Sequence, residues 1–511
     1  MIIPEPSSCS SEKKNMDVSF IVSPSNVTSN YMPFYYLYLA GYLEKEGYSC
    51  EIVNDICSNE ESYYLHIVKH LKKTQPHFVA LAAFVTDYDQ SLKLATKIKA
   101  ETGIPVIVGN AHPSISPQDF IYPGSPFDIV IRGEGEVTLS EIIKNRMDPV
   151  GFKEIRGIAF LDDGKIRVTQ NREIMNLQDC GMPAYHLLDV SRYSHPTKYL
   201  IRKIPASCAI IYLGRGCPFK CGFCAANAVW QANDCLQAQS FVRNRPIMTV
   251  IEELTLLEKK YGFDFFYILD DTFGITENEI IEFCEAYQKS GLTMLWAAES
   301  RVNSSCFKNE KILELMRDTG CIQLDLGVET GSPRLLKIIR KGITVDQIHN
   351  AFALCKKYSI RTFANILINL AEETEEDIQL TESLLNEIRP TVVSVGVTQP
   401  YPGTYFYEKY IVDPIKTEEY RDLNRLLPLE KYRMANHNLP LHDLLLHFQF
   451  RFGIYTPLEL SVLKTDSRYW KKIIYSPRRI QYLIYFLKMM VAAPFIEYVM
   501  MYITKGRWRK E

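Results

Sequence analysis

The sequence has almost no net charge, because 58 Lys and Arg residues stand against 60 Asp and Glu residues and leave a formal charge of −2. Such a balance gives no long-range field that gathers a polyanion, so we expect no nucleic acid among the partners. The first segment, MIIPEPSSCSSEKKN, also lacks the basic start and the continuous apolar stretch of a signal peptide. We therefore expect a cytoplasmic protein.

Disulfide bonds are not expected either, because the cytoplasm keeps thiols reduced. The chain nevertheless holds 13 cysteines, so a tight cluster of them is better explained by a metal site or by catalysis. Of the 511 residues, 47% are hydrophobic, which is enough to bury a large core. At about 100 to 200 residues per domain, this length predicts two or three domains.

Short apolar segments alternate with amphipathic segments in the first third of the chain, which is typical of a parallel sheet with crossover helices. We expect helices at about 34–46, 62–74 and 88–101. The pattern predicts an open, doubly wound, Rossmann-like α/β domain over residues 16–150. The expected strands are DVSFIV (17–22), SCEIVN (49–54), FVALAAF (78–84), IPVIVG (104–109) and DIVIRG (128–133).

A doubly wound sheet binds its ligands outside the carboxyl ends of its strands. That rule singles out Thr86, the stretch 109–113 and the turn RGEGE at 132–136. The alternative, in which Gly109 and Gly133 are only turn residues, stays open.

Residues 151–200 have a different pattern, and we interpret them as a linker between domains. GIAFLDDGKIRVTQ predicts a hairpin that turns at Asp163 and Gly164. Strand and helix patterns alternate again over 201–408, and six such units favour a partial (β/α)6 barrel of the TIM type over a closed eight-unit barrel. The expected barrel strands are AIIYLG, FFYILD, TMLWAAE, IQLDLGV, RTFANILI and VVSVGV.

The first of these strands runs into the loop GRGCPFKCGFCAANAVW, in which Cys217, Cys221 and Cys224 are spaced C-x3-C-x2-C. Three thiolates in one short loop can bind three corners of a [4Fe-4S] cluster and leave the fourth iron open. A zinc site would prefer four ligands, commonly two C-x2-C pairs, and no partner pair follows at suitable spacing. Cys208 and Cys235 flank the loop, and we interpret both as ordinary buried or exposed residues.

This loop resembles the signature of the radical S-adenosylmethionine (SAM) superfamily, C-x3-C-x-aromatic-C, with Phe223 in the aromatic position. The resemblance implies that SAM chelates the open iron and that reduction of the cluster cleaves SAM to a 5'-deoxyadenosyl radical. It also implies a small-molecule or lipid-like substrate and an external electron donor such as flavodoxin or ferredoxin.

Other segments resemble the subfamily of radical SAM enzymes in which a cobalamin-binding domain precedes the barrel. The resemblance covers residues from about 17 to 408 and implies a third cofactor, cobalamin, in addition to the cluster and SAM. The segments that carry it are GNAHPSISPQDF, FDIVIRGEGEVTLSEII, RNRPIMTVIEELTLLEKKYGFDFFYILDDTF, GCIQLDLGVETGSPRLLKIIRKGIT and TQPYPGTYFYE.

The resemblance also implies roles for single residues. Phe223 matches the residue that approaches the adenine of SAM. Asp270 and Asp271 stand where many members carry a Gly-Gly-Glu run that receives the methionine amino group, and a carboxylate can accept hydrogen bonds from an ammonium. Arg301 is then a candidate for the methionine carboxylate, and Glu329 for the ribose hydroxyls.

Purely structural alternatives exist for most of these charged residues. Asp270 and Asp271 would serve equally well as caps of a helix that starts after Thr272. Arg301 would pair with Glu299 on the same strand end.

In the first domain, the resemblance places a cobalamin-like site at Thr86, Gly109, His112, Gly133 and Glu134. The D-x-H-x-x-G signature, whose His replaces the lower axial ligand of cobalt, is absent, because the corresponding region reads NDICSNEES (54–62). This absence argues against ligation by a His rather than against binding. A domain that keeps the fold and binds nothing is the competing interpretation.

Residues 409–511 predict a helical C-terminal region. Within the tract at 479–510, residues 480–504 approach the roughly twenty apolar residues of a spanning helix, but Lys488, Pro494 and Glu497 interrupt them. We expect an amphipathic helix pair that packs on the barrel or lies at the inner face of a membrane, with the segment RWRK (507–510) at the interface.

Two enzymatic functions follow from the resemblance. The first is cobalamin-dependent methylation of an unactivated carbon in a biosynthetic pathway. The alternative is a radical cyclisation, oxidation or rearrangement without methyl transfer, on a lipid-like or natural-product substrate. A non-enzymatic protein with a structural cluster is disfavoured, because an open iron corner has no structural purpose.

Overall fold

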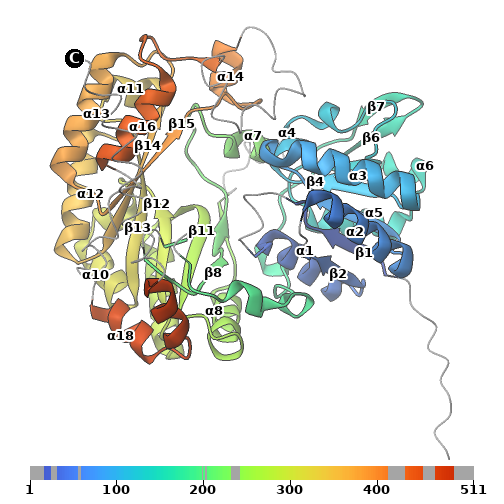
Figure 1. Cartoon of the computed structure of the whole chain (residues 1–511), viewed down its shortest axis with the longest axis horizontal. Helices are drawn as coiled ribbons and strands as arrows, with labels where there is room; N and C mark the ends of the chain where they lie inside the picture. Colours follow the sequence, from blue (N-terminus) through green and yellow to red (C-terminus); the bar gives the residue numbers. More distant parts are fainter. Residues whose placement is uncertain are drawn as a thin grey trace, which may run out of the picture.

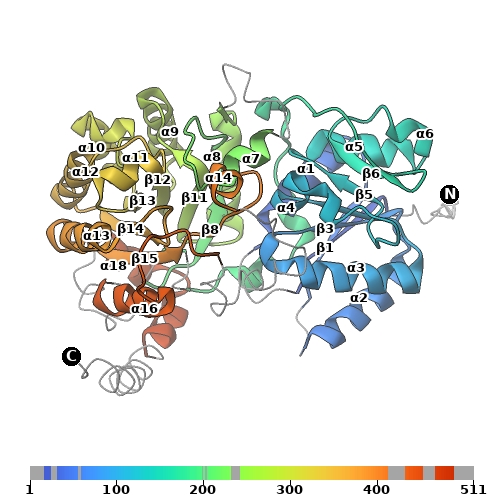
Figure 2. The same cartoon turned by 90° about the horizontal axis from the view of Figure 1, so that it is seen from above.

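The computed structural model describes residues 16–24, 32–55, 59–197, 200–201, 204–231, 242–411, 432–452 and 467–487. Two parallel sheets lie side by side in it, each with its own layer of helices (Figures 1 and 2). The C-terminal helices, drawn in orange-red and red, lie against the second sheet.

The first sheet has seven strands in the order β2-β1-β3-β4-β5-β6-β7, and its first five strands are parallel. This order confirms the predicted doubly wound domain, and each of the five expected strands is present. The parallel strands are β1 (Val18–Ile21), β2 (Cys50–Val53), β3 (Phe78–Ala82), β4 (Val106–Gly109) and β5 (Ile129–Ile131).

Helices cover both faces of this sheet. On one face, apolar side chains of α1 (Phe34–Lys45) and α5 (Glu136–Asn145) pack with Phe20 and Ile107. On the other, α2 (Glu60–Thr74) and α3 (Tyr88–Thr102) pack with alternate residues of the same strands. The alternation of side chains along each strand therefore feeds two separate apolar layers. The short helices α4 (Ala111–Ile115) and α6 (Pro149–Phe152) complete the domain.

The predicted hairpin at Asp163 and Gly164 is present as β6 (Ile158–Asp162) and β7 (Lys165–Val168). It was predicted within the linker, but β6 pairs antiparallel with β5 and extends the first sheet. The correction has a physical reason: Ile158 and Phe160 are buried in the domain core, so β6 is not a free connector. The antiparallel hairpin then ends the sheet with the exposed strand β7.

The second sheet has six parallel strands in the order β15-β14-β13-β12-β11-β8, which confirms the predicted partial barrel. Its helices include α9 (Glu277–Ser290), α12 (Val345–Lys357) and α13 (Glu375–Ile388), each of which begins with a capping box at a Thr. The remaining outer helices are α8 (Ile247–Thr255), α10 (Glu310–Asp318) and α11 (Pro333–Ile338). The strands are β8 (Cys208–Ile211), β11 (Phe265–Phe273), β12 (Leu295–Ser300), β13 (Cys321–Glu329), β14 (Arg361–Ile368) and β15 (Val392–Val397).

Two described helices follow the barrel. Helix α16 (Leu441–Phe452) packs on β14 and β15, and α18 (Ser467–Tyr475) packs near the amino ends of the strands, where the hydroxyl of Tyr469 donates to the carbonyl of Pro205. Of the predicted tract at 479–510, only 479–487 is described, as a helix, and the rest lies outside the described residues. Within the described ranges, every helix is too short or too polar to cross a bilayer.

Candidate functional site

The cysteine loop begins directly after β8, at the carboxyl edge of the second sheet. It leads through the short strand β9 (Gly214–Arg215) to helix α7 (Ala226–Gln231). Cys217, Cys221 and Cys224 are half-buried free thiols. Burial of Cys224 and, after it, the two neighbouring thiols of the loop raise the pKa of Cys224 to about 11.

Two backbone hydrogen bonds at Gly222 anchor this loop to neighbouring segments. The amide of Gly222 donates to the carbonyl of Ile339 at 2.8 Å, and the amide of Phe406, in α14 (Tyr405–Tyr410), donates to the carbonyl of Gly222 at 3.0 Å. A Cβ at position 222 would lie 3.1 Å from the rings of Tyr405 and Phe406, so glycine is needed for this close approach.

Asp270 and Asp271 both accept hydrogen bonds from the loop backbone. Asp270 accepts from the amides of Leu213 and Gly214 at 2.8 and 3.2 Å, and Asp271 accepts from the amide of Gly216 at 2.9 Å. Burial raises the pKa of both carboxyls, and these amide hydrogen bonds lower it. Both residues therefore hold the segment that leads to the first cysteine.

The alternative that this pair caps a following helix is wrong. Helix α9 begins at Glu277, and the side chain of Thr276 is its cap. The strand β11 continues through both aspartates to Phe273, which directs them toward the neighbouring loop instead.

Arg301 lies against the cysteine loop. Its Nη1 lies 3.4 Å from the Sγ of Cys221, its guanidinium stacks at 3.7 Å on the ring of Phe219, and its Nη2 donates to the carbonyl of Lys341. The predicted pair between Arg301 and Glu299 is wrong, because the arginine turns to the loop while Glu299 is exposed. A buried cation beside a thiolate offsets negative charge on a cluster.

Glu329 forms a buried ion pair with Lys341, 2.5 Å between Oε1 and Nζ, next to the same loop. Its backbone has a φ of 65°, an uncommon conformation for a residue other than glycine. The lysine also faces the ring of Phe223, 5.9 Å from the ring centre. Phe223, Arg301 and Glu329 are thus brought together around the cysteines.

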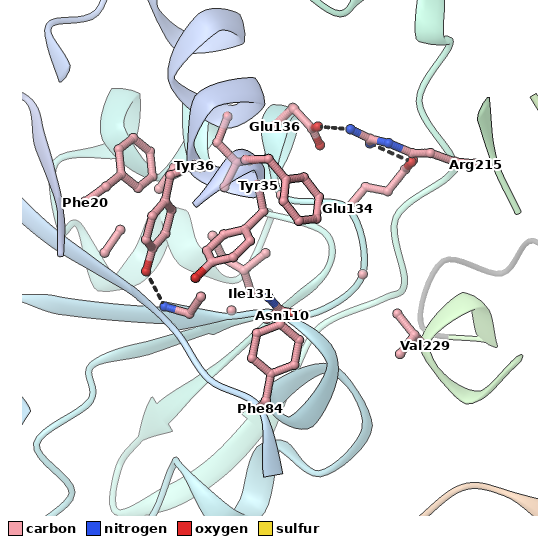
Figure 3. A pocket seen from close by; sticks show the side chains of 18 of the residues that line it. Phe20, Tyr35, Tyr36, Phe84, Asn110, Ile131, Glu134, Glu136, Arg215 and Val229 are labelled. Carbon is pink, nitrogen blue, oxygen red and sulfur yellow. Dashed lines mark hydrogen bonds and ion pairs between the residues drawn. The ribbon is translucent and has the colours of Figure 1, made fainter. Parts of the chain in front are cut away.

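A mostly apolar cavity of about 400 Å³ opens at the carboxyl edge of the first sheet (Figure 3). Gly109, Gly133 and Glu134 line it, as predicted residues of the cobalamin-like site. Its other wall comes from the cysteine loop and from the strand that anchors it. The lining side chains include Phe20, Phe34, Tyr35, Tyr36, Phe84, Ile131, Glu136, Arg215, Val229, Trp230, Leu269 and Asp271.

Two predicted residues of this site do not line the cavity. His112 is buried elsewhere, with its ring 4.9 Å from that of Phe120 and its Nε2 2.8 Å from Asp119. The first turn of α4 directs it toward α3, where it packs on Tyr88. Thr86 is exposed in the short 3-10 helix that precedes α3 and is also not part of the lining.

The residues that the sequence analysis missed are Arg215, Arg243 and Trp230, which lie between the two sheets. Arg215 forms ion pairs with Glu134 and Glu136, at 3.0 and 2.6 Å, and Arg243 also pairs with Glu134 at 2.9 Å (Figure 3 draws the pairs of Arg215). Trp230 donates from Nε1 to Asp271 at 3.1 Å. Only the position of Arg215 in the loop, two residues before Cys217, offered a signal.

A second cavity, of about 320 Å³, lies inside the barrel and shares a wall with the first. Phe34, Tyr35, Phe84 and Leu269 line both. Polar side chains of the barrel strands also line it, namely Tyr267, Glu299, Asp325, Asn365 and Ser394.

The residues present fit the groups that the sequence implies. Across the part of the chain that the structure describes, no three His, Cys, Asp or Glu side chains converge on a single metal ion. Three half-buried thiols in one loop are the donor set of a [4Fe-4S] cluster, in which each thiolate binds a different iron. The first cavity, with aromatic walls and a charged rim, fits the faces and the polar edge of a flat macrocycle.

Fold and site define a radical SAM protein with an amino-terminal cobalamin-binding-type domain. A model described as Radical SAM superfamily matches residues 211–385, and one described as B12 binding domain matches residues 25–143. The chain therefore carries both a radical SAM domain and a B12-binding domain, and these two domains imply a [4Fe-4S] cluster, SAM and cobalamin as cofactors.

Relatives of known sequence or structure span most of the chain. An uncharacterized methyltransferase of Pyrococcus horikoshii is 29% identical over 399 residues, which are 78% of this chain and 82% of that protein. An anaerobic magnesium-protoporphyrin IX monomethyl ester cyclase of Rubrivivax gelatinosus is 26% identical over 80% of this chain and 71% of its own length. The radical SAM methyltransferase TsrM from Kitasatospora setae has the same fold, with a TM-score of 0.61 at 17% identity over 77% of this chain and 74% of TsrM.

Proposed function

We propose that the protein methylates an unactivated carbon of a small molecule, with cobalamin as the methyl carrier. The observation that carries this proposal is the wall shared by the two cavities. Phe34, Tyr35, Phe84 and Leu269 face both the cavity at the B12-binding domain and the cavity inside the barrel. A substrate in the barrel and a methyl donor in the first domain would then be neighbours, as direct transfer requires.

The chain's own residues supply binding, orientation and charge. When bound, the cluster with SAM supplies a radical that abstracts hydrogen, and cobalamin supplies the methyl group. Cys217, Cys221 and Cys224 would hold the cluster through three of its irons, and Arg301 would compensate the negative charge of the thiolates. Glu329, which Lys341 holds in an ion pair, would accept the ribose hydroxyls of SAM.

Asp270 and Asp271 take a different role in this proposal from the one that the sequence pattern indicates. Their oxygens accept amides of the loop at 2.8 to 3.2 Å. We assign them to positioning the cluster loop, and we leave the methionine carboxylate to Arg301.

Product analysis tests methyl transfer. The reconstituted protein with SAM, a reductant and a substrate extract should form S-adenosylhomocysteine as well as 5'-deoxyadenosine, because one SAM would donate a methyl group and another would be cleaved. Omission of cobalamin is the control and should abolish S-adenosylhomocysteine. Formation of 5'-deoxyadenosine alone in the complete mixture would overturn the proposal.

Formation of 5'-deoxyadenosine without S-adenosylhomocysteine would favour the alternative function, a radical cyclisation, oxidation or rearrangement. Similarity to the magnesium-protoporphyrin cyclase supports this alternative. The cyclase reaction adds no methyl group, so the mass of the product distinguishes the two functions.

The electron for the cluster would come from an external donor, and we propose a flavodoxin or a ferredoxin. Support comes from the family, because radical SAM enzymes depend on such donors. SAM cleavage with reduced flavodoxin or ferredoxin, compared with dithionite, tests this. Cleavage with dithionite only, for several donors of each kind, would count against it.

We also propose that the C-terminal region lies at the inner face of a membrane and that the substrate is lipid-like. Six large apolar side chains are exposed on 467–487, and basic residues stand among them. Exposed apolar groups with flanking Lys and Arg are typical of helices that lie in a membrane surface. The apolar side chains are Ile474, Tyr475, Ile480, Leu483, Ile484 and Leu487.

Flotation with vesicles of phosphatidylcholine and phosphatidylglycerol tests this contact. The protein should float with the vesicles, and the double variant Ile480→Ser, Leu483→Ser should stay in solution. Leu65→Ser is the matched control, because Leu65 is equally exposed, at 56%, on α2 of the first domain. Equal behaviour of the wild type and the double variant would exclude this surface.

A further inference from the structure

We propose that Arg215 is a positioning residue that links the cobalamin cavity to the cluster loop, so that the two cofactors bind cooperatively. The inference rests on the presence of the two cofactors and not on methyl transfer. It concerns four charged residues that lie between the two sheets, namely the partly buried Arg215 and Arg243 and the buried Glu134 and Glu136.

The two arginines are direct neighbours on a small antiparallel ribbon. Arg215 of β9 is paired in register with Arg243 of β10 (Arg243–Asn244). Two cations at adjacent positions of a ribbon repel each other unless an anion stands between them. Glu134 provides that anion, since its Oε1 lies 3.0 Å from Arg215 and 2.9 Å from Arg243.

In the first domain, Glu134 belongs to the turn between β5 and α5, and Glu136 is the first residue of α5. Gly133, at the start of this turn, has a φ of 78°, and the turn lines the cavity as far as Glu136. The side chains of Glu134 and Glu136 are only 6% and 4% exposed. Removal of one partner would leave a buried charge without compensation, which is strongly unfavourable.

Arg215 therefore contacts both sites, one through its side chain and the other through its backbone. Its guanidinium binds the turn that lines the cobalamin cavity, and its backbone lies two residues before Cys217. Its Nη2 also donates to the hydroxyl of Tyr212 at 2.6 Å, which restricts the side chain further. A ligand that orders the turn must also order the start of the cluster loop, and the reverse holds as well.

Reciprocal ordering of this kind is a coupling free energy between two sites. If loading of the cluster fixes Arg215, it also fixes Glu134 and Glu136 at the rim of the cavity. Cobalamin then binds more tightly, because these cavity residues are already ordered before it binds. By the same linkage, bound cobalamin strengthens retention of the cluster.

The affinity for hydroxocobalamin, measured by equilibrium dialysis without oxygen, tests the proposal. The full-length protein is compared in its iron-free and iron-loaded forms. We expect the loaded form to bind hydroxocobalamin at least about five-fold more tightly, the lower end of typical couplings. Arg215→Met should bind equally in both forms.

Two further variants separate coupling from general destabilisation. Glu136→Gln keeps the shape of the side chain and should also remove most of the difference, even if Arg215→Met fails to fold. Arg172→Met is the matched control, because Arg172 pairs with Glu141 on the same helix α5 but does not line the cavity. It should keep the full difference between the two forms.

The electron paramagnetic resonance spectrum of the reduced cluster gives a second readout. Cobalamin should change it in the wild type and leave it unchanged in Arg215→Met. Equal affinity of the two wild-type forms, or an undiminished difference in both variants, would overturn the proposal. Neither result depends on which reaction the enzyme catalyses.

Discussion

The two sheets present the same edge to each other and use it in different ways. The carboxyl edge of the barrel carries thiols and buried ions, such as Cys217, Arg301 and the pair of Glu329 with Lys341. The facing edge of the first sheet carries glycine and apolar side chains, such as Gly109 and Ile131. The barrel edge would bind its cofactors through coordinating thiols and charged side chains, and the edge of the first sheet through its shape and its apolar area. We therefore expect a single substitution of a thiol at the barrel edge to abolish cofactor binding, and one at the edge of the first sheet to weaken binding in proportion to the added volume.

The largest effect is expected at the cysteines. Cys217→Ala, Cys221→Ala or Cys224→Ala should each lower the iron content from about four per chain to less than one, because the loop at 214–230 holds no fourth cysteine to replace the lost ligand. Anaerobic reconstitution followed by iron and sulfide analysis measures this. Cys180→Ala, which is similarly half-buried, should keep all its iron. A single variant that retained the cluster and SAM cleavage would refute the assignment.

At the apolar edge, bulk should block cobalamin. Gly109→Trp would fill part of the cavity, because a Cβ added at position 109 would lie 3.6 Å from the Cβ of Ile131. We expect the affinity for hydroxocobalamin to fall by about 100-fold, or about 2.7 kcal/mol, while the iron content stays the same. Ala100→Trp, on the exposed face of α3, is the control. Undiminished binding by Gly109→Trp would place the cofactor elsewhere.

The charge of Arg301 at the barrel edge should set the reduction potential of the cluster and should not be needed for binding the cluster. Arg301→Gln removes the cation next to Cys221 and should make the reduction potential more negative by roughly 60 mV, a ten-fold change for one electron. A redox titration monitored by electron paramagnetic resonance measures this shift. Arg301→Lys keeps the charge and should shift the potential much less; equal shifts would show that charge is not the cause.

The smallest effect concerns a buried acid at the apolar edge. Burial raises the pKa of Asp87 to about 6 from an ordinary value of 3.8, although the amide of Phe84 donates to it. The folded protein thus holds a proton that the unfolded chain releases, so stability falls as the pH rises from about 4 to 6. Asp87→Asn should remove about 2 kcal/mol of this fall. Urea unfolding at pH 4 and pH 6.5 gives the free energy of unfolding of the wild type and of Asp87→Asn. If both proteins lost the same free energy of unfolding between these pH values, the assignment would be contradicted.

The sequence was sufficient to predict the strands and the cysteine loop, because both are local. Each expected strand is a short apolar run, and the three thiols lie within eight consecutive residues of one another. The hairpin was also local, but its attachment to β5 depends on the burial of Ile158 and Phe160, which the pattern did not reveal.

The charged contacts between the sheets could not be predicted in this way. Arg215 and Glu134 are 81 positions apart, and nothing in the spacing relates them. His112 shows the opposite error, since its motif indicated the right loop but not the face of α4 on which the ring lies. Side-chain direction in short helices and ion pairs at long range both depend on the packed structure.

The wall between the two cavities has a consequence for how such enzymes diversify. Phe34, Tyr35 and Phe84 belong to the first domain, whereas the thiols and the ions around them belong to the barrel. Mutations in these three aromatic side chains would reshape the chamber for the substrate and leave the radical-generating loop intact. New substrates can then be explored at positions that are separate in the gene from those that make the radical.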